Sequence, residues 1–176
     1  MINKILIPLL LITLVTSCQN KKNMNKEYEW RVSANAPKNF PATIYYASLG
    51  GVEVRRDGTI DSGWGMSGSS VEGLKTLPKT LDLIWLSYID NQFYKGNFKL
   101  DQEKIKHIFN EGFKDNFGKD NITYHDFSFV INVAPGGTVA LFMKGLGSFQ
   151  RGVGFFKAEK TDVKWKDFVP MGMQDR

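Results

Sequence analysis

Glycine interrupts this chain at short intervals, and aromatic residues fill the stretches between the glycines. The 176 residues include 17 glycines, 13 phenylalanines, 6 tyrosines and 4 tryptophans. Aromatic side chains favour strands, and closely spaced glycines supply the tight turns that join antiparallel strands. The pattern therefore predicts an α+β fold that is mainly β, either an antiparallel sheet or a β-sandwich, in which helices are the minority.

One segment, residues 101–111, has the pattern of an amphipathic helix. Asp101 suits the N-cap position, and Gly112 suits the left-handed position that ends a helix. The apolar residues between them recur at helical spacing and form one stripe: Ile105, Ile108 and Phe109. We expect this helix to pack its stripe against the sheet.

The clearest strands lie on either side of the sequence Pro135-Gly136-Gly137. Residues 127–133 alternate apolar and polar side chains, and residues 138–144 return after the turn, which predicts a hairpin. Residues 81–89 are apolar on both alternating faces, so we expect a strand buried on both faces with Trp85 in the core. Weaker strand patterns occupy residues 28–33, 41–48, 52–55, 152–158 and 163–169, whereas residues 61–73 are predicted to form an exposed loop.

The only cysteine follows a short apolar run near the amino end of the chain. Lys4 precedes the apolar residues 5–15, which are about half of the roughly 20 residues that a bilayer crossing needs. The arrangement resembles a bacterial lipoprotein signal, in which residues 1–17 are removed and Cys18 becomes the lipidated amino terminus. A plain secretory signal is the alternative, but it leaves Cys18 as a lone thiol in an oxidising compartment.

This interpretation divides the chain into three parts. Residues 1–17 are the signal peptide, residues 18–26 are the lipidated cysteine with a flexible tether, and residues 27–176 are a single globular β-rich domain. Acyl chains on Cys18, palmitate among them, would anchor the protein to a membrane. Gln19 stands where an aspartate favours the inner membrane in enteric bacteria, so by analogy we expect the periplasm-facing leaflet of the outer membrane in the bacterial cell envelope.

Charge and cysteine content exclude several classes of function. The chain carries 23 Lys and Arg against 18 Asp and Glu, and only Lys4 lies in the predicted leader. No basic run exceeds two residues, so the sequence predicts no nucleic-acid partner. Once Cys18 is acylated no thiol remains, and the domain then has neither a disulfide framework nor a thiolate metal cluster.

The segment Gly63-Trp64-Gly65-Met66-Ser67-Gly68 matches the G-x-G-x-x-G pattern of dinucleotide-binding loops. That pattern requires a helix directly after the glycines, but Gly73 and Pro78 leave room for barely one turn. We therefore interpret these residues as turn glycines and predict no cofactor. Trp64 and Met66 are instead the candidate ligand- or partner-binding residues, because they place apolar side chains on an exposed loop. In the alternative, Trp64 folds back as a lid, with its ring buried and its indole N–H bonded to backbone.

No catalytic or metal site is predicted. His107 and His125 are the only histidines, and a catalytic zinc usually takes three protein ligands. Glycoside cleavage needs two carboxylates facing each other across a cleft. The acidic residues considered for that role are Asp82, Asp90, Asp101 and Glu103, and the sequence does not group them.

The stretch from Leu77-Pro78 through the apolar run around Trp85 to Phe93-Tyr94, Leu100 and the amphipathic helix resembles domain of unknown function 2931. The resemblance extends from Cys18 and its preceding residues to the Pro135-Gly136-Gly137 turn. That family comprises uncharacterised bacterial lipoproteins, so the resemblance implies an anchored envelope protein and transfers no functional residue.

Three functional hypotheses follow. The first, which we favour over catalysis, is a non-enzymatic binding module that is lipid-anchored at Cys18, faces the periplasm and binds a protein partner in the envelope. The second is an immunity-type inhibitor of a toxin delivered to the periplasm. The third is an envelope hydrolase or carbohydrate-active protein.

Overall fold

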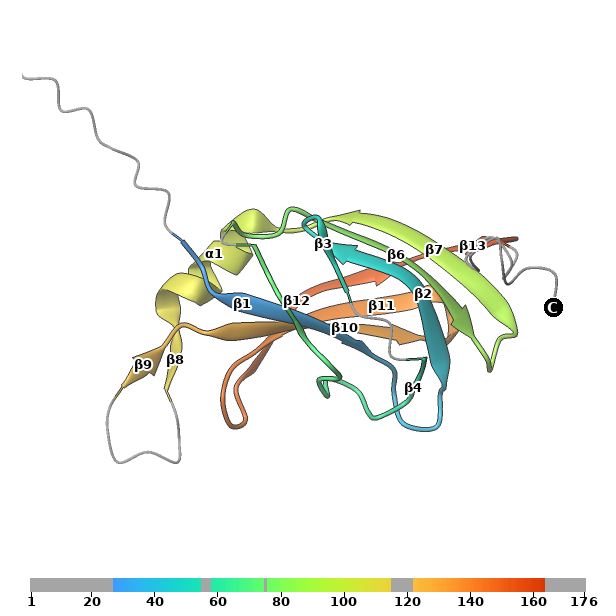
Figure 1. The fold of residues 1–176 in the computed structure, drawn as a ribbon, viewed down its shortest axis with the longest axis horizontal. Coiled ribbons are helices and arrows are strands. Elements are labelled where there is room, and N and C mark those ends of the chain that lie inside the picture. The colour runs from blue at the N-terminus through green and yellow to red at the C-terminus, as the bar shows by residue number, and fades with distance from the viewer. Residues whose placement is uncertain (1–26, 55–57, 75, 115–121, 164–176) are drawn as a thin grey trace, which may run out of the picture.

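The computed structural model describes residues 27–54, 58–74, 76–114 and 122–163, and this part of the chain forms mainly strands (Figure 1). The first sheet, sheet A, has the order β12 (Gln150–Lys157), β11 (Thr138–Lys144), β10 (Phe127–Ala134), β1 (Trp30–Asn35) and β5 (Val71–Glu72). The second, sheet B, has the order β13 (Glu159–Thr161), β7 (Gln92–Lys99), β6 (Thr80–Ser87), β2 (Ala42–Leu49) and β3 (Val52–Glu53), with β4 (Thr59–Ile60) also paired to β2. Strands β8 (Phe113–Lys114) and β9 (Thr123–Tyr124) form a separate small hairpin.

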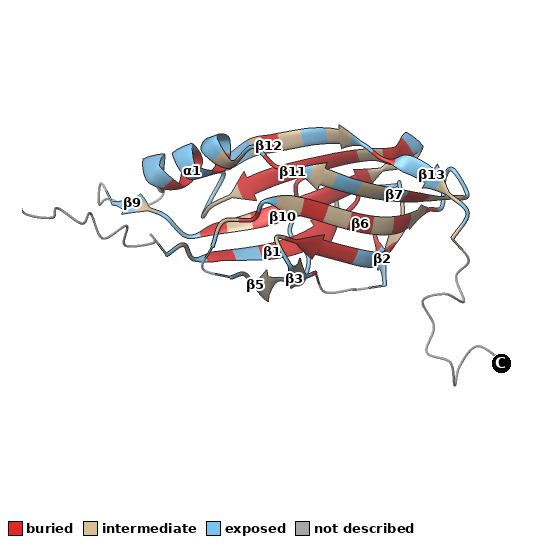
Figure 2. Cartoon of the chain, turned by 90° about the horizontal axis from the view of Figure 1, so that it is seen from above, coloured by how far each residue is buried: buried red, intermediate tan, exposed pale blue. Residues whose placement is uncertain are grey.

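The two larger sheets stack as a β-sandwich, and the core lies between them (Figures 1 and 2). Alternate residues of each strand point into this core, as the period of two requires. Phe98 of β7 stacks on Phe156 of β12 with ring centroids 4.6 Å apart, which joins the sheets directly. The structure therefore confirms the predicted mainly-β fold and selects the sandwich.

Strand pairing is antiparallel throughout the described strands except between β1 and β10, which run parallel in register from Trp30↔Phe127 to Asn35↔Asn132. The first strand of the domain thus lies inside sheet A, between β10 and the two-residue edge strand β5. This parallel pair was not predicted from the sequence, because the alternation in each strand carries no information about the direction of its neighbour.

The predicted amphipathic helix is present as α1 (Gln102–Glu111), which lies at one end of the sandwich (Figure 1). The Asp101 carboxylate caps it by accepting from the Lys104 amide at 2.9 Å. The predicted stripe is buried, and the Phe109 ring packs 5.1 Å from Tyr28 and 4.8 Å from Phe127. Gly112 has the expected positive φ, 67°, but its ψ of −165° lies outside the left-handed helical region that was predicted.

The hairpin between β10 and β11 is also confirmed. Its turn, η1 (Pro135–Gly137), has Gly136 at φ 69° and Gly137 at φ 77°. Gly137 approaches the neighbouring backbone closely, since a Cβ at this position would lie 2.6 Å from the Ala158 carbonyl oxygen. The Gly137 carbonyl accepts a hydrogen bond from the Ala158 amide at 2.7 Å, which ties the turn to the segment that leads into β13.

The expectation for residues 81–89 is wrong in one respect. Leu81, Leu83 and Trp85 of β6 are buried in the core, but Ile84 and Leu86 on the other face are half-buried and Tyr88 is exposed. Strand β6 is central in sheet B, yet within the described part of the chain nothing covers the outer face fully. The apolar residues on the outer face of β6 are half-buried because side chains of the neighbouring strands, such as Phe93 opposite Leu86, cover them in part.

Several predictions fall on residues outside the described ranges. These are the signal peptide 1–17, Cys18 and the tether to residue 26, the strand end at residue 55, and most of the predicted strand 163–169. Among the described residues, no helix has the length and apolar content to cross a membrane.

Candidate functional site

The predicted glycine-rich loop lies across the outer face of sheet A. The Gly63 amide donates to the Ala36 carbonyl at 3.1 Å, and the Gly65 amide donates to Oδ1 of Asn132 at 2.8 Å. Gly65 is buried, whereas Ser67 and the residues that follow it are exposed. The loop is therefore on the surface, as predicted, but its first half is fixed to the sheet beneath it.

Two buried asparagines hold this loop. Asn35 and Asn132 are paired in register on adjacent strands, and both side chains point out of the sandwich toward the loop. Oδ1 of Asn35 accepts from the amides of Ala36 at 2.8 Å and Ser62 at 3.1 Å, and its Nδ2 donates to the Met66 carbonyl at 2.9 Å. A buried amide side chain with its hydrogen bonds satisfied specifies one loop position, because leaving those groups unpaired is costly.

The glycines of the G-x-G-x-x-G pattern have a structural explanation. Gly65 has φ 72°, and a Cβ there would lie 2.7 Å from the Gln150 side chain. The amides of Gly63, Gly65 and Met66 are already bonded within the protein, so they are not directed at a ligand phosphate. Strand β5 follows the loop where a dinucleotide fold needs a helix. These observations support the interpretation as turn glycines.

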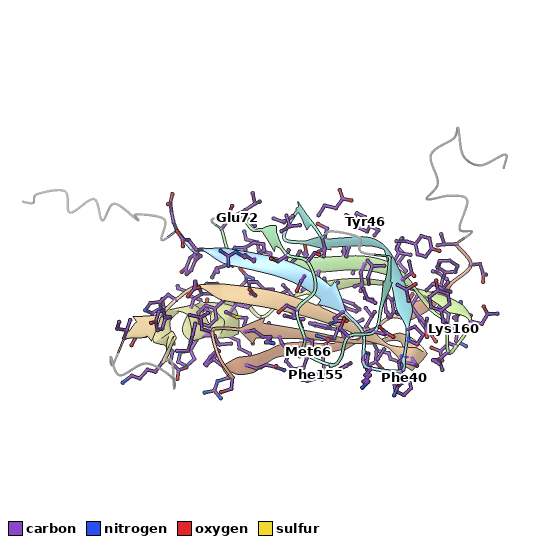
Figure 3. The ribbon with its side chains drawn as sticks, turned by 60° about the horizontal axis from the view of Figure 1, so that its bottom comes forward. Phe40, Tyr46, Met66, Glu72, Phe155 and Lys160 are labelled. Atoms are coloured by element: carbon purple, nitrogen blue, oxygen red, sulfur yellow. The ribbon has the colours of Figure 1, made fainter. Side chains whose placement is uncertain are left out.

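Trp64 and Met66, the two predicted binding residues, lie on the surface with 40% and 52% of their area exposed. The Trp64 ring packs edge-on against Phe142 of β11 at 6.0 Å, and Phe142 packs edge-on against Phe155 of β12 at 5.8 Å. Phe155 is 68% exposed. We call Trp64, Met66, Phe142 and Phe155 the aromatic patch; Figure 3 labels Met66 and Phe155 on the same side of the molecule. Trp64 is thus partly packed and partly exposed, between the two alternatives stated for it.

Phe155 is a surface residue that was not predicted from the sequence. A signal was present, because Phe155 and Phe156 are adjacent in a strand and adjacent side chains point to opposite faces. Phe156 packs into the core against Phe98, so Phe155 must point outward. Asn35 and Asn132 were also missed, since polar residues in a strand are ordinarily assigned to the solvent face.

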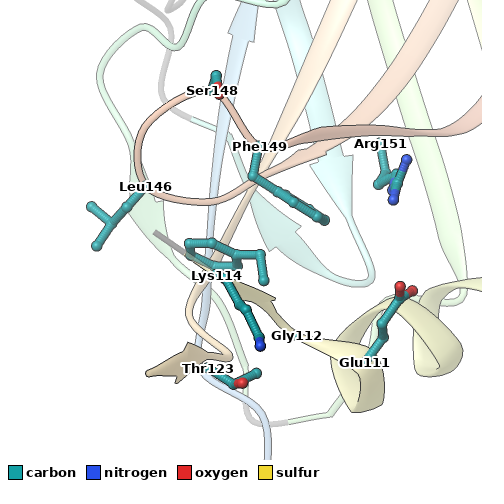
Figure 4. Close-up of a pocket in the computed structure, with 9 residues that line it drawn as sticks. Glu111, Gly112, Lys114, Thr123, Leu146, Ser148, Phe149 and Arg151 are labelled. Atoms are coloured by element: carbon teal, nitrogen blue, oxygen red, sulfur yellow. The ribbon is translucent and has the colours of Figure 1, made fainter. Parts of the chain in front are cut away.

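Two open grooves flank the β8–β9 hairpin at the end where residue 27 enters the fold. One, of about 400 Å³, contains Lys114, Leu146, Phe149 and Arg151 among its lining residues (Figure 4). The other, of about 620 Å³, is lined by residues 27–29, Arg31, Phe109 and residues 123–126. Thr123 contributes to both grooves, so the two grooves are adjacent.

The two histidines do not form a shared site. Nδ1 of His125 lies 2.7 Å from the carbonyl oxygen of Phe109, so this ring ties β9 to the last turn of α1. Nε2 of His107 is 3.8 Å from Glu111 on the exposed face of the same helix. Among the described residues, no group of three His, Cys, Asp or Glu side chains is placed to hold a metal ion.

The four acidic residues considered for glycoside cleavage are spread over the molecule. Asp82 is bonded to Asn97 on the outer face of sheet B, and Asp101 caps the helix with Glu103 in its first turn. Oδ2 of Asp90 accepts from the Tyr94 hydroxyl at 3.0 Å. None of the four lines either groove beside the β8–β9 hairpin.

Asp90 also joins the two sheets at the end opposite the helix. Its Oδ2 accepts from the Gly136 amide at 2.6 Å, which connects the β6–β7 turn to η1. Burial raises the pKa of the Asp90 carboxyl, but the hydrogen bonds from Gly136 and nearby hydroxyls outweigh burial and hold that pKa below its ordinary value. Burial and the adjacent carboxylate both raise the pKa of the Tyr94 hydroxyl. This arrangement is a structural clamp between the sheets.

A family model described as protein of unknown function, DUF2931, matches residues 17–176. The chain belongs to this family. The matched residues include all the described strands and the helix, the loop with Trp64 and Met66, and the residues that line both grooves beside the β8–β9 hairpin. No curated protein and no solved structure matches the chain.

Proposed function

We propose that this DUF2931 protein is a lipid-anchored component of the bacterial envelope that acts by binding a protein partner. The aromatic patch is the observation that supports this function. The exposed Trp64 ring lies on a loop whose backbone is fixed by Asn35 and Asn132, and the exposed Phe155 ring lies on strand β12, so little conformational entropy is lost when a partner covers them. Tryptophan, methionine and phenylalanine are enriched at the centres of protein interfaces.

The proposed anchor rests on the sequence. Signal cleavage before Cys18 would leave its sulfur and amine for acylation, with palmitate as one fatty acid, and Gln19 supports the outer membrane. The domain would then face the periplasm from the inner leaflet. Mass spectrometry of the amino-terminal peptide from purified envelopes tests this step. We expect a peptide that begins at acylated Cys18; an unmodified residue 18 with the leader still attached would contradict it.

Binding is favoured over hydrolysis because the four acidic residues considered for catalysis are spread over the molecule, and three of them, Asp82, Asp90 and Asp101, have structural partners. The Asp90 carboxylate clamps a turn and Asp101 caps the helix, so neither faces another of the four across a groove. Catalysis on a glycosidic bond requires two carboxyl groups about 5–10 Å apart on either side of the substrate. The arrangement of these residues therefore offers the hydrolase hypothesis no support.

The binding role is tested by cross-linking in intact envelopes, followed by quantitative mass spectrometry of the captured protein. Trp64→Ala and Phe155→Ala remove exposed rings of the patch, and Tyr46→Ala removes a comparable ring, 41% exposed, from the outer face of sheet B. We expect both patch variants to reduce recovery of the partner at least about tenfold, the usual cost of an interface hot spot. The Tyr46→Ala control should recover it as wild type does. Equal recovery by all three variants would contradict the proposal.

In the immunity hypothesis the aromatic patch would bind a secreted toxin as its partner. Cells expressing that toxin in the periplasm should survive with the wild-type protein and die with Trp64→Ala. Survival with both proteins, or death with both, would remove this alternative while leaving other partners open to the cross-linking experiment.

A further inference from the structure

The folded chain begins at a particular end of the molecule. Residues 27–29 and Arg31 line one groove together with residues 123–126, which comprise β9 and the two residues after it. The Tyr28 ring packs on Phe109 of α1. Figure 1 shows the start of β1, helix α1 and the β8–β9 hairpin at the same end of the sandwich. We call this the anchor-proximal end, because the proposed lipid attachment at Cys18 lies just before it in the chain.

The length of chain before residue 27 limits how far this end can move from a bilayer. Residues 19–26 can span at most about 26 Å when fully extended. Strand β10 has eight residues and covers about the same length within the domain. The anchor-proximal end therefore stays within about one strand length of the lipid. The tether thus gives this end a high effective concentration at the bilayer surface, which favours even weak contacts between the two.

Two apolar side chains are exposed at this end. Leu146, in the connection between β11 and β12, is 52% exposed, and Ile122, just before β9, is 48% exposed. Leu146 and Thr123, the neighbour of Ile122, line the same groove. Figure 4 shows the Leu146 side chain pointing outward from its loop.

These apolar side chains rest on a rigid base. Phe113 of β8 stacks on Phe149 at 5.1 Å and on Tyr124 of β9 at 5.7 Å, and its edge contacts Phe127 at 5.2 Å. Stacked rings of this kind fix the loop and the hairpin relative to the sheet. The exposed position of Leu146 is thus supported by packing from below.

Charge distinguishes the two grooves beside the hairpin. The groove with Leu146 contains two cations, Lys114 and Arg151, and one acid, Glu111. The other groove contains three acids, Glu27, Glu29 and Asp126, with Arg31 as its only Lys or Arg among the described lining residues. Apolar side chains flanked by Lys and Arg are typical of surfaces that bind anionic lipid headgroups.

We propose that the anchor-proximal end docks on the lipid surface itself, with Leu146 and Ile122 entering the headgroup region and Lys114 and Arg151 contacting lipid phosphates. This inference rests on the proposed anchoring at Cys18. Docking in this way fixes the orientation of the sandwich, so that the opposite end, with Asp90 and η1, points away from the membrane.

The test uses the full mature lipoprotein in vesicles of phosphatidylethanolamine with one quarter phosphatidylglycerol. Acylation blocks the sulfur of Cys18, so Leu146→Cys supplies the only free thiol for a polarity-sensitive NBD dye. Tyr46→Cys, on the outer face of sheet B, is the matched control. We expect a blue shift and a roughly twofold rise in emission at position 146 when vesicles are present, and no change at position 46. An equal change in emission at the two positions when vesicles are added would overturn the proposal.

Labelling of the unsubstituted protein separates failure of the anchor from failure of docking. Incorporation of one dye per chain would show a free Cys18 and refute the anchoring, whereas no incorporation with unshifted emission at position 146 refutes docking alone. Charge reversal of Lys114 and Arg151 to Glu should lower the emission change at 146. The same reversal of Lys95 and Lys160, which line a groove beside β13, should not. Equal effects of the two reversals would overturn the role of Lys114 and Arg151.

Discussion

Replacing Asn35 with alanine should release the loop that carries Trp64 and Met66 of the aromatic patch. The change removes three hydrogen bonds, to the amides of Ala36 and Ser62 and to the carbonyl of Met66. Ala36 is fully buried, so its amide would lose its partner without access to water, at a cost of about 1–3 kcal/mol. The groups on Ser62 and Met66 can bond to water, and each loss costs about 0.5–1 kcal/mol. Asn35→Ala should therefore lower the free energy of unfolding by about 2–5 kcal/mol.

Urea unfolding measures this free energy, and hydrogen exchange measures the loop directly. The amides of Gly63 and Gly65 are bonded in the wild-type protein, and we expect them to exchange faster in Asn35→Ala. Ser62→Ala is the matched control, because Asn35 contacts only the backbone amide of that residue; it should stay within about 0.5 kcal/mol of wild type. A stability for Asn35→Ala equal to that of the control, with unchanged exchange at Gly65, would refute the assigned role of Asn35.

Three further predictions concern stability and its pH dependence. Gly137→Ala should destabilise by about 3 kcal/mol in urea unfolding because its Cβ would clash with the Ala158 carbonyl, whereas Gly136→Ala, with similar φ and only an ordinary contact with the Lys157 side chain at 3.6 Å, should cost about 1 kcal/mol; equal losses would contradict the clash. Phe109→Ala should cost about 3–5 kcal/mol, since its buried ring contacts three other rings; a loss below about 1 kcal/mol would show that helix α1 is not anchored there. The pKa of Asp90 is lowered in the folded protein, so its carboxylate stabilises the fold. At pH values above the ordinary aspartate pKa of about 3.9 this contribution should be less than about 1 kcal/mol, and it should be lost as the pH falls through the lower folded-state pKa. Urea titrations should therefore show wild type more stable than Asp90→Asn at pH 6 and the difference shrinking below pH 4, and a constant difference would contradict the clamp.

Local signals accounted for the features that the sequence predicted well. The Asp101 cap, the stripe around Phe109 and Gly112 are all within one short segment, and each is set by residues a few positions apart. The turn at Gly136 likewise depends on the conformation of its own residues. Features of this kind can be inferred without knowledge of the partner elements.

Long-range pairing accounted for the features that the sequence did not predict. The parallel register of β1 with β10 brings Asn35 beside Asn132, and neither strand's alternation specifies that neighbour. Trp64 could be named as a candidate from its loop, but Phe155 required knowledge of which face of β12 is covered. The sequence therefore predicted Trp64 and Met66 of the aromatic patch, but not Phe142 and Phe155.

The position of β1 inside sheet A, between β10 and β5, has a consequence for how the protein is made. Its parallel partner, β10, lies in the second half of the chain, so synthesis must pass residue 134 before the first strand can be enclosed. Contacts between such distant segments form slowly, because a long loop must close first. A chain that travels amino end first through an export channel would therefore stay unfolded during most of its passage and complete sheet A only after arrival.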